Sequence, residues 1–414
     1  MPRFTPTIIG IIIVGTVVAG LFVWFFFFSG STPTPATQGD TTGGGNTTVS
    51  VTPDGGGGTG TTNNTGTPTN QSTPSTQTIF KIATGPVVAA TFIQTTQPTT
   101  TLVRYIAQDN AHVTDFAIDV PGAVGRGASN ITIPGISEAL WAAGGRTALL
   151  RYVDNGVIKT LSLTFSVSTT TKQVTSRARF LPDGITGAAF SPDGKNMVYL
   201  LRGASGADGY TAFADGSAPK KLFSLPLSQL IISWPSAPTV LLYTKSSAGV
   251  PGVLFSVNIS SGSVSPLLYA EGLTAIANST FTYLIYQTAP ATGQGVSTYV
   301  RNIKTGLNMP VSFDPYPEKC VWSPSAAFVV YCARPLSYAP PTYLDSWHQG
   351  ATSFNDSIFG YNLQAQQSVI VATPGSGDGG VPSDILSLAV SPDDQYLLFI
   401  KKDDRSLWGV RLGQ

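Results

Sequence analysis

The fold is decided by the stretch Phe190-Ser191-Pro192-Asp193-Gly194-Lys195-Asn196-Met197-Val198-Tyr199-Leu200, because the chain repeats it. Imperfect copies follow at 322–331 (WSPSAAFVVY) and 390–399 (VSPDDQYLLF). Each copy ends one apolar strand, turns on Ser-Pro and begins a second apolar strand. Proline presets φ at the second turn position, aspartate suits the third, and Gly194 can adopt the left-handed conformation that closes the turn. The repeating unit is therefore strand, turn, strand.

Weaker copies of this unit emerge when the residue before each turn is used as a marker. The markers are Phe92, Trp141, Phe190, Trp234, Ala277, Trp322 and Val390. They are separated by 49, 49, 44, 43, 45 and 68 residues. A period in the forties with four strands per unit is typical of a β-propeller. The sequence thus predicts an all-β, seven-bladed propeller over residues 78–414, with an insertion in blade six.

The end of the chain predicts how the ring closes. Blade seven has only three predicted strands, the last at 407–412. The segment 78–83 (TIFKIA) precedes blade one and has the length and alternation of a strand. We expect it to pair with the last strand, which completes blade seven and removes an exposed sheet edge. In blade one, alternation also predicts an outer strand at 129–133.

The first 77 residues have a different composition. Residues 8–28 are 21 uncharged, largely apolar positions, which as a helix reach about 30 Å, the hydrocarbon thickness of a bilayer. They end in aromatics that suit a membrane interface, and no cleavage site follows, so a signal anchor is favoured over a cleaved signal peptide. Arg3 is the only charge before them. It predicts a cytoplasmic tail at 1–7 and an extracytoplasmic location for everything after residue 28.

Residues 29–77 consist almost wholly of Thr, Gly, Pro, Ser, Asn and Gln. Such a segment has too few apolar side chains to offset the entropy lost on ordering. We expect a disordered linker that tethers the propeller to the membrane.

The repeat resembles the β-propeller repeat of TolB, a relative of the WD repeat that occurs in extracytoplasmic proteins of bacteria and archaea. The resemblance rests on the Trp/Phe-Ser-Pro-Asp-Gly pattern and the strand after it, as in 190–200, 322–331 and 390–399. It implies the fold and leaves the function open, because this repeat serves scaffolds, peptidase gating domains and lyases. TolB has a separate domain before its propeller, whereas this chain has an apolar segment and a linker there. A role in the Tol system is therefore not carried over.

The blade-six insertion, 333–356, is the candidate binding site. Propeller loops between second and third strands lie around the mouth of the central channel. Its candidate residues are Tyr338, Tyr343, Asp345, Trp347, His348 and Phe354. Aromatic side chains on a long loop can form a recognition surface, or they can form a small satellite core packed on the propeller face. Asp345 and His348 alone do not define a catalytic or metal pair, because no third ligand or nucleophile accompanies them.

Cys320 and Cys332 are the only cysteines. They lie on the two strands that flank the Ser323-Pro324 turn, where a cross-strand disulfide is geometrically reasonable. An extracytoplasmic location also permits it. The alternative is two buried free thiols, since a register shift of one residue would separate the sulfur atoms.

Composition limits the function classes. Only 11% of the residues are charged and the net charge is +1, so we expect no nucleic-acid partner. With two histidines in the chain, we expect no metal site and no cofactor. The sequence favours a membrane-anchored, non-catalytic propeller that binds a protein or glycan partner. The alternative is an extracytoplasmic lyase or hydrolase of carbohydrate with its site at the channel mouth.

Overall fold

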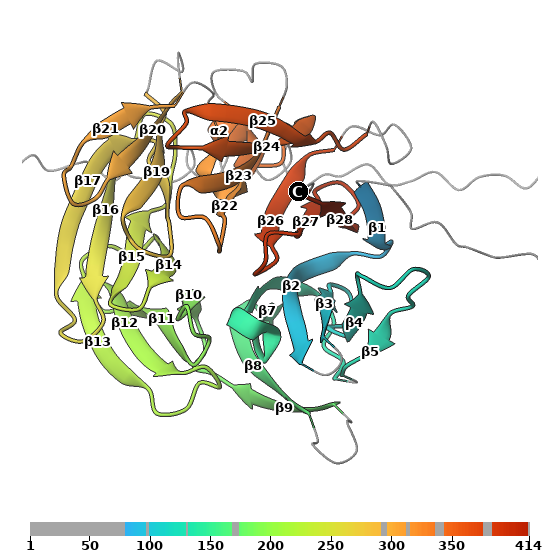
Figure 1. Cartoon of the computed structure of the whole chain (residues 1–414). Helices are drawn as coiled ribbons and strands as arrows, with labels where there is room; N and C mark the ends of the chain where they lie inside the picture. The colour runs from blue at the N-terminus through green and yellow to red at the C-terminus, as the bar shows by residue number, and fades with distance from the viewer. Residues whose placement is uncertain are drawn as a thin grey trace, which may run out of the picture. The chain divides into compact units, whose positions relative to one another are not determined.

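The computed structural model describes residues 79–96, 99–129, 131–167, 174–290, 296–311, 315–335, 343–375 and 383–412. They form seven antiparallel sheets of four strands each, arranged around a common axis (Figure 1). The all-β, seven-bladed propeller is therefore confirmed. Among the described residues, no helix has the length and apolar character needed to cross a membrane. Residues 8–28, the linker 29–77 and Tyr338 lie outside the described part of the chain.

The first four blades run from the innermost to the outermost strand in sequence order. Their strands are β2 (Val87–Thr96), β3 (Thr99–Ala107), β4 (Val113–Ala117) and β5 (Arg126–Gly127); β6 (Ile136–Trp141), β7 (Thr147–Asp154), β8 (Val157–Val167) and β9 (Val174–Phe180); β10 (Ile185–Phe190), β11 (Asn196–Gly203), β12 (Gly206–Phe213) and β13 (Lys220–Leu225); β14 (Leu230–Ser236), β15 (Thr239–Thr244), β16 (Pro251–Asn258) and β17 (Val264–Glu271). The short 3-10 helix η1 (Ala143–Gly145) joins β6 to β7.

Blades five to seven follow the same plan, except that the last blade borrows a strand from the start of the domain. Their strands are β18 (Thr274–Ala277), β19 (Tyr283–Thr288), β20 (Ser297–Asn302) and β21 (Asn308–Pro310); β22 (Cys320–Trp322), β23 (Val329–Pro335), β24 (Asp356–Asn362) and β25 (Gln367–Ala372); β26 (Ile385–Val390), β27 (Tyr396–Lys401), β28 (Leu407–Arg411) and β1 (Ile79–Ala83). Two short helices lie in blade six, η2 (Pro317–Lys319) and α2 (Tyr343–His348).

All seven marker residues lie on innermost strands, so the predicted repeat with a period in the forties is confirmed. The outer strand of blade one is a correction, because it is β5 and not 129–133. Backbone bonding to β4 ends near Ala128, whose N–H donates to the Val113 carbonyl. Ile131 and Ile133 pack against the core from the following loop, and this packing accounts for their alternation.

The Ser-Pro-Asp turns form as the sequence predicts and also join neighbouring blades. Gly194 has φ +68° and Asp394 takes the same left-handed conformation at φ +54°. A side chain on Gly194 would place its Cβ 2.5 Å from the Ala143 carbonyl oxygen of blade two, so glycine is required there. Between blades six and seven, Ser323 donates a hydrogen bond of 2.7 Å from Oγ to Asp394.

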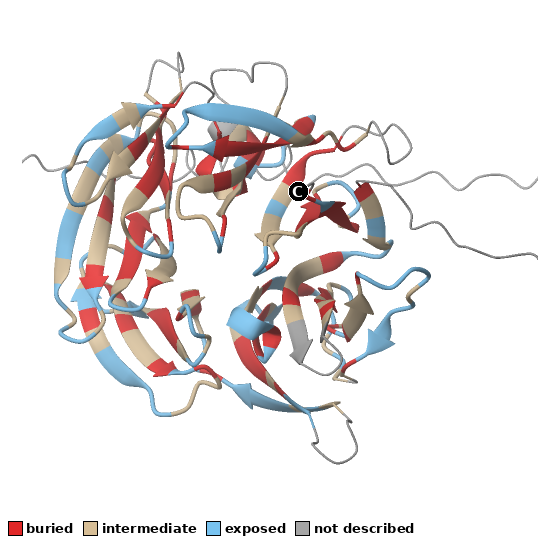
Figure 2. Cartoon of the chain, in the orientation of Figure 1, coloured by how far each residue is buried: buried red, intermediate tan, exposed pale blue. Residues whose placement is uncertain are grey.

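The core is divided among the blade interfaces. One cluster of buried apolar residues lies at each of the seven interfaces between consecutive blades, including the interface of blade seven with blade one. Buried positions are concentrated on the second strand of each sheet, while most of the outermost strands are largely exposed (Figure 2). Each blade therefore depends on both of its neighbours for burial.

The ring closes through antiparallel pairing of β1 with β28. Ile79 pairs with Val410 and Phe80 with Gly409, and the first and last strands lie side by side (Figure 1). A Cβ on Gly409 would come within 2.6 Å of the Phe80 ring, so the ring occupies the space that glycine leaves free. The prediction that 78–83 supplies the fourth strand of blade seven is confirmed, with β1 beginning at Ile79.

Deleting residues 78–83 should destabilise the propeller. The truncation removes the buried Ile79 from the interface of blades six and seven and Phe80 from that of blades seven and one. We expect a loss of about 3 kcal/mol or more, which lowers Tm by roughly 5 °C or more. Thermal unfolding and gel filtration are the measurements, and we expect the exposed edge of β28 to promote association. Deletion of residues 55–60, outside the propeller, is the matched control. An unchanged Tm with a monomeric product would contradict this account of closure.

Candidate functional site

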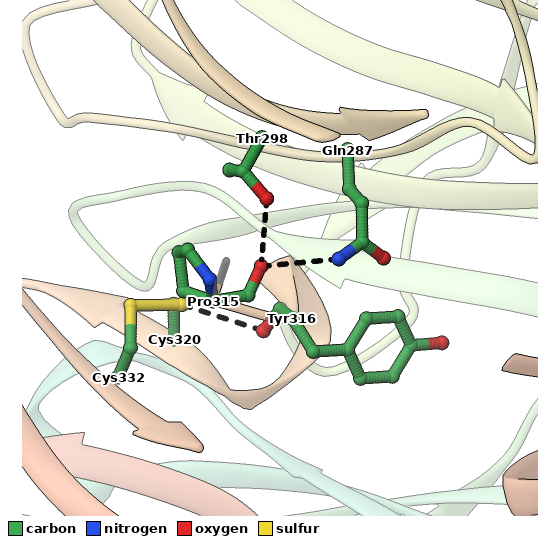
Figure 3. The surroundings of a disulfide bond; sticks show 6 residues. All are labelled: Gln287, Thr298, Pro315, Tyr316, Cys320 and Cys332. Carbon is green, nitrogen blue, oxygen red and sulfur yellow. Dashed lines mark hydrogen bonds between the residues drawn. A yellow bond between two sulfur atoms is a disulfide. The ribbon is translucent and has the colours of Figure 1, made fainter. Parts of the chain in front are cut away.

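A disulfide fixes the base of the candidate site in blade six. Cys320 on β22 lies directly opposite Cys332 on β23, and the two sulfur atoms are bonded. The Cys320 sulfur lies 3.3 Å from the carbonyl oxygen of Tyr316; this is a packing contact, because a disulfide sulfur has no proton to donate. Figure 3 shows that the preceding Pro315 carbonyl accepts hydrogen bonds from Gln287 and Thr298 of blade five. The connection from blade five to blade six is thus held by hydrogen bonds to blade five at Pro315 and by the disulfide within blade six.

The insertion leaves blade six between its second and third strands. Because β23 extends to Pro335 and β24 begins at Asp356, the excursion itself spans 336–355, slightly less than the predicted 333–356. Its described part contains α2 and the turn that follows. The structure places Asp345, Trp347 and His348 on α2 and Phe354 beyond it. The backbone of Tyr343 begins α2, and its side chain lies outside the described part of the structure.

Trp347 is the centre of a small satellite core. It is only 8% exposed and packs with Tyr316 and Phe354. Its ring meets Tyr316 edge-on, with centroids 5.3 Å apart, and stacks with Phe354 at 6.5 Å. Of the two interpretations of the aromatic cluster, the geometry therefore favours packing for Trp347. Its buried ring is not a free recognition anchor.

Four charged side chains, three of them buried, hold this satellite core to the propeller. The Lys319 ammonium lies between two carboxylates, 2.7 Å from Asp356 and 2.5 Å from Asp384, and all three side chains are at most 1% exposed. Lys402 approaches Asp384 from blade seven at 3.3 Å. Two positive and two negative side chains balance. Such a buried group stabilises the fold only while every member is present, because removing one leaves an uncompensated charge.

The insertion is tied to this charge cluster. The Trp347 indole Nε1 donates to both oxygens of Asp384, at 3.1 and 2.9 Å. The Lys402 ammonium donates to the carbonyl oxygens of Trp347 and Thr352 at 3.3 and 3.0 Å. On its other side, α2 reaches blade four, where Asp345 accepts a hydrogen bond of 3.2 Å from the Ala248 N–H. The insertion is therefore held by partners in blades four and seven as well as its own.

A second cluster of titratable side chains, formed by Tyr316, Glu318 and His348, lies beside α2. The Tyr316 hydroxyl and His348 Nε2 are hydrogen-bonded at 2.7 Å, and Glu318 lies 3.7 Å from the same His348 nitrogen. Burial raises the pKa of Glu318 to about 7, although its hydrogen bond with Tyr316 and the charge of Lys245 oppose the rise. Partial burial of its ring also lowers the pKa of His348, so the histidine is neutral near pH 7. One Glu318 oxygen, Oε1, is buried without a hydrogen-bond partner in the described structure.

Sequence reasoning missed Lys319, Glu318, Tyr316 and Asp384. They lie in the connections that lead into innermost strands, and the insertion reaches them only through folding. A sequence signal did exist, since only 11% of residues are charged and Glu318 and Lys319 directly precede the apolar strand β22. A charge so close to an inner strand needs a buried partner.

The innermost strands carry almost no ionisable side chains. Glu138 of β6 is the only acidic or basic residue on the seven of them, and Arg151 pairs with it. A mainly apolar cavity of about 280 Å³ lies between strands of blades one, two and seven. A wider groove of about 510 Å³ lies between blades three and four, lined by residues such as Phe213, Lys220 and Trp234. Within the described residues, no group of three or more His, Cys, Asp or Glu is placed to hold a metal.

Comparisons with known proteins show the fold alone. No family model and no curated protein matches the sequence. Among solved structures, the chain resembles an oligogalacturonate lyase from Vibrio parahaemolyticus, with a TM-score of 0.53 and 10% identity over 82% of this chain and 93% of that one. A chain of the mitotic checkpoint complex has a TM-score of 0.49 and 12% identity over 81% and 91%. At these identities the resemblance carries no statement about activity.

Replacing Trp347 by alanine should destabilise the propeller by about 3–5 kcal/mol, the cost of removing a buried aromatic side chain. The substitution also leaves Asp384 without its indole donor. Chemical denaturation measures the loss. Gln349→Ala, on the exposed turn just after α2, is the control and should change the stability by less than about 0.5 kcal/mol. Equal stability of the two variants would show that Trp347 is not part of a core.

The raised pKa of Glu318 makes a pH-dependent contribution to stability. Its pKa rises from the ordinary 4.5 to about 7, so the folded state binds this proton more tightly than the unfolded state. Compared with pH values above 7, binding of this proton stabilises the folded state by at most about 3 kcal/mol below pH 4.5. This stabilisation is lost as the pH rises to 7. Glu318→Gln should therefore gain stability over the wild type progressively across this window, as measured by denaturation at several pH values. A difference that is constant between pH 4 and 8 would show that Glu318 titrates normally.

Proposed function

We propose that this chain is a non-catalytic binding propeller, anchored to a membrane by residues 8–28, that presents one face to protein or glycan partners outside the cytoplasm. The observation that carries the proposal is the attachment of the insertion. Bonds from blade four, from blade seven and from Tyr316 at the entry to blade six all hold α2, so the turn after it is fixed on the propeller face. The exposed residues of this segment are His348, Gln349, Gly350, Ala351, Ser353 and Asn355.

A fixed surface of this kind suits binding. Association costs less when the contact residues are already ordered, because little conformational entropy is lost on binding. The sequence left two roles open for the insertion, a satellite core and a recognition surface. Different parts of the insertion fill them, since a buried core lies below the segment and exposed polar groups lie above it. Trp347 packs, and the turn beyond it is free to meet a partner.

The innermost strands favour binding over catalysis. Hydrolysis or elimination at a channel mouth needs acids and bases that converge on the substrate. Glu138 is paired with Arg151, and Lys319 bridges Asp356 and Asp384 in a buried cluster. These groups are committed to the fold.

Two features favour an extracytoplasmic location on a membrane. The 21-residue apolar run at 8–28 has the length of a membrane-spanning helix. The disulfide between Cys320 and Cys332 suits an oxidising compartment, since thiols in the cytosol are kept reduced.

A carbohydrate lyase or hydrolase is the second candidate, and one observation favours it. Glu318, Tyr316 and His348 are three titratable groups in contact beside the insertion, and a carboxyl with a pKa of about 7 suits a general acid or base. In this reading Glu318 would exchange a proton with the substrate.

One pair of variants tests the binding proposal. Gln349→Arg alters the exposed turn, and Ser260→Arg places the same side chain on the exposed loop between β16 and β17, which lies on the opposite face. Binding of the full chain is measured on a glycan array and by cross-linking in native membranes. We expect Gln349→Arg to weaken retention of the partner by about tenfold or more, the loss expected for a contact worth about 1.4 kcal/mol. Equal loss in both variants would contradict the proposed face.

The catalytic alternative has its own assay. The wild type is incubated with oligogalacturonate, the substrate class named for the similar lyase, and unsaturated products are measured. We expect no product. Turnover in the wild type that Glu318→Gln abolishes, with the fold intact, would replace the binding proposal by the catalytic one.

A further inference from the structure

The outermost strand of every blade has one edge with no partner strand among the described residues. Proteins protect such edges with charged residues, prolines or very short strands. Six of the seven outermost strands follow this rule. Their protecting residues are Lys81 in β1, Arg126 in β5, Arg177 and Arg179 in β9, Lys220 and Lys221 in β13, Pro266 in β17 and Pro310 in β21.

The outermost strand of blade six, β25, is the exception. Its sequence, QSVIVA, contains neither a charge nor a proline. Val369 is 63% exposed and Ile370 is 57% exposed, and the strand lies on the rim of the ring with most of its length exposed (Figure 2). It pairs with β24 on one side only. A six-residue, β-branched, uncharged edge is a template for a further strand.

We infer that β25 is a self-association site, at which the β25 of a second copy of this chain pairs antiparallel to it. In a two-fold arrangement, each residue lies opposite a residue of the same strand. A charged strand would therefore meet its own charge, and this opposes self-pairing of β9 and β13. Nothing in β25 repels its own copy.

The register of the pair follows from the side chains. With Ile370 opposite Ile370 of the other copy, Val369 lies opposite Val371, so apolar residues meet on both faces. On the face that carries Val369 and Val371, Gly360 of β24 has no side chain. A methyl group of Val371 lies 3.3 Å from the position that a Cβ on Gly360 would occupy. Cross-strand pairs of β-branched residues stabilise such a ladder.

The contact is small. A single pair of six-residue strands buries less area than a stable dimer needs, so the association is weak and transient, in the micromolar range. It leaves the insertion of each copy uncovered by the pairing strands, since β25 lies at the rim. The inference does not depend on the proposed binding function.

Sedimentation velocity of the full chain between about 1 and 100 µM tests the inference, because a contact of this size titrates in that range. We expect the dimer fraction of the wild type to rise with concentration. Ile370→Lys should weaken the association at least tenfold, and Val369→Lys should do the same. Tyr269→Lys, at a 71% exposed position on β17, is the matched control and should associate like the wild type. Melting curves establish that each variant is folded.

Hydrogen exchange separates the possible occupants of the edge. In a dimer of two β25 strands, protection of the β25 amides rises with protein concentration. Protection that is already complete at the lowest concentration would show that another segment of the same chain covers the edge, and this would overturn the inference. A monomer at every concentration, or equal weakening by Ile370→Lys and Tyr269→Lys, would also overturn it.

Discussion

The pairing of β1 with β28 is the contact on which the rest of the propeller depends. Each blade buries its apolar face only against its two neighbours, so an open ring would expose both ends of the array. β1 supplies the outer strand of blade seven, and Phe80 and Ile82 pack into the cluster that blade seven shares with blade one. One short segment thus converts seven sheets with local contacts into a closed structure in which every blade interface is filled.

The fold was predictable because the propeller repeats one local rule. The Ser-Pro-Asp turn requires particular residues at fixed offsets, and Gly194 and Asp394 adopt the left-handed conformation that such a turn needs. Ring closure was predictable from the missing fourth strand of blade seven. The outer strand of blade one was not, because Ile131 and Ile133 alternate as strand residues do while packing from a loop. Alternation reports burial, and burial does not require a strand.

Only part of the candidate site was visible in the sequence. The insertion, its aromatic residues and the cysteine pair were identified, because a loop of unusual length and two opposed strands are local features. The partners of the insertion were not identified. Lys319, Asp384 and Lys402 are distant from Trp347 in sequence, and only the packing of blade six against blade seven brings their charges together. A polar cluster assembled across blades leaves no periodic signal in any one of them.

Native-state hydrogen exchange tests the claim of a closed, cooperative ring most directly. If pairing with β28 closes the propeller, the amides of β1 exchange with the same free energy of opening as those of β27, because both open only when the whole ring unfolds. Exchange of β1 at the rate of an unfolded peptide, while β27 stays protected, would contradict the account. The propeller would then be stable without its closing strand.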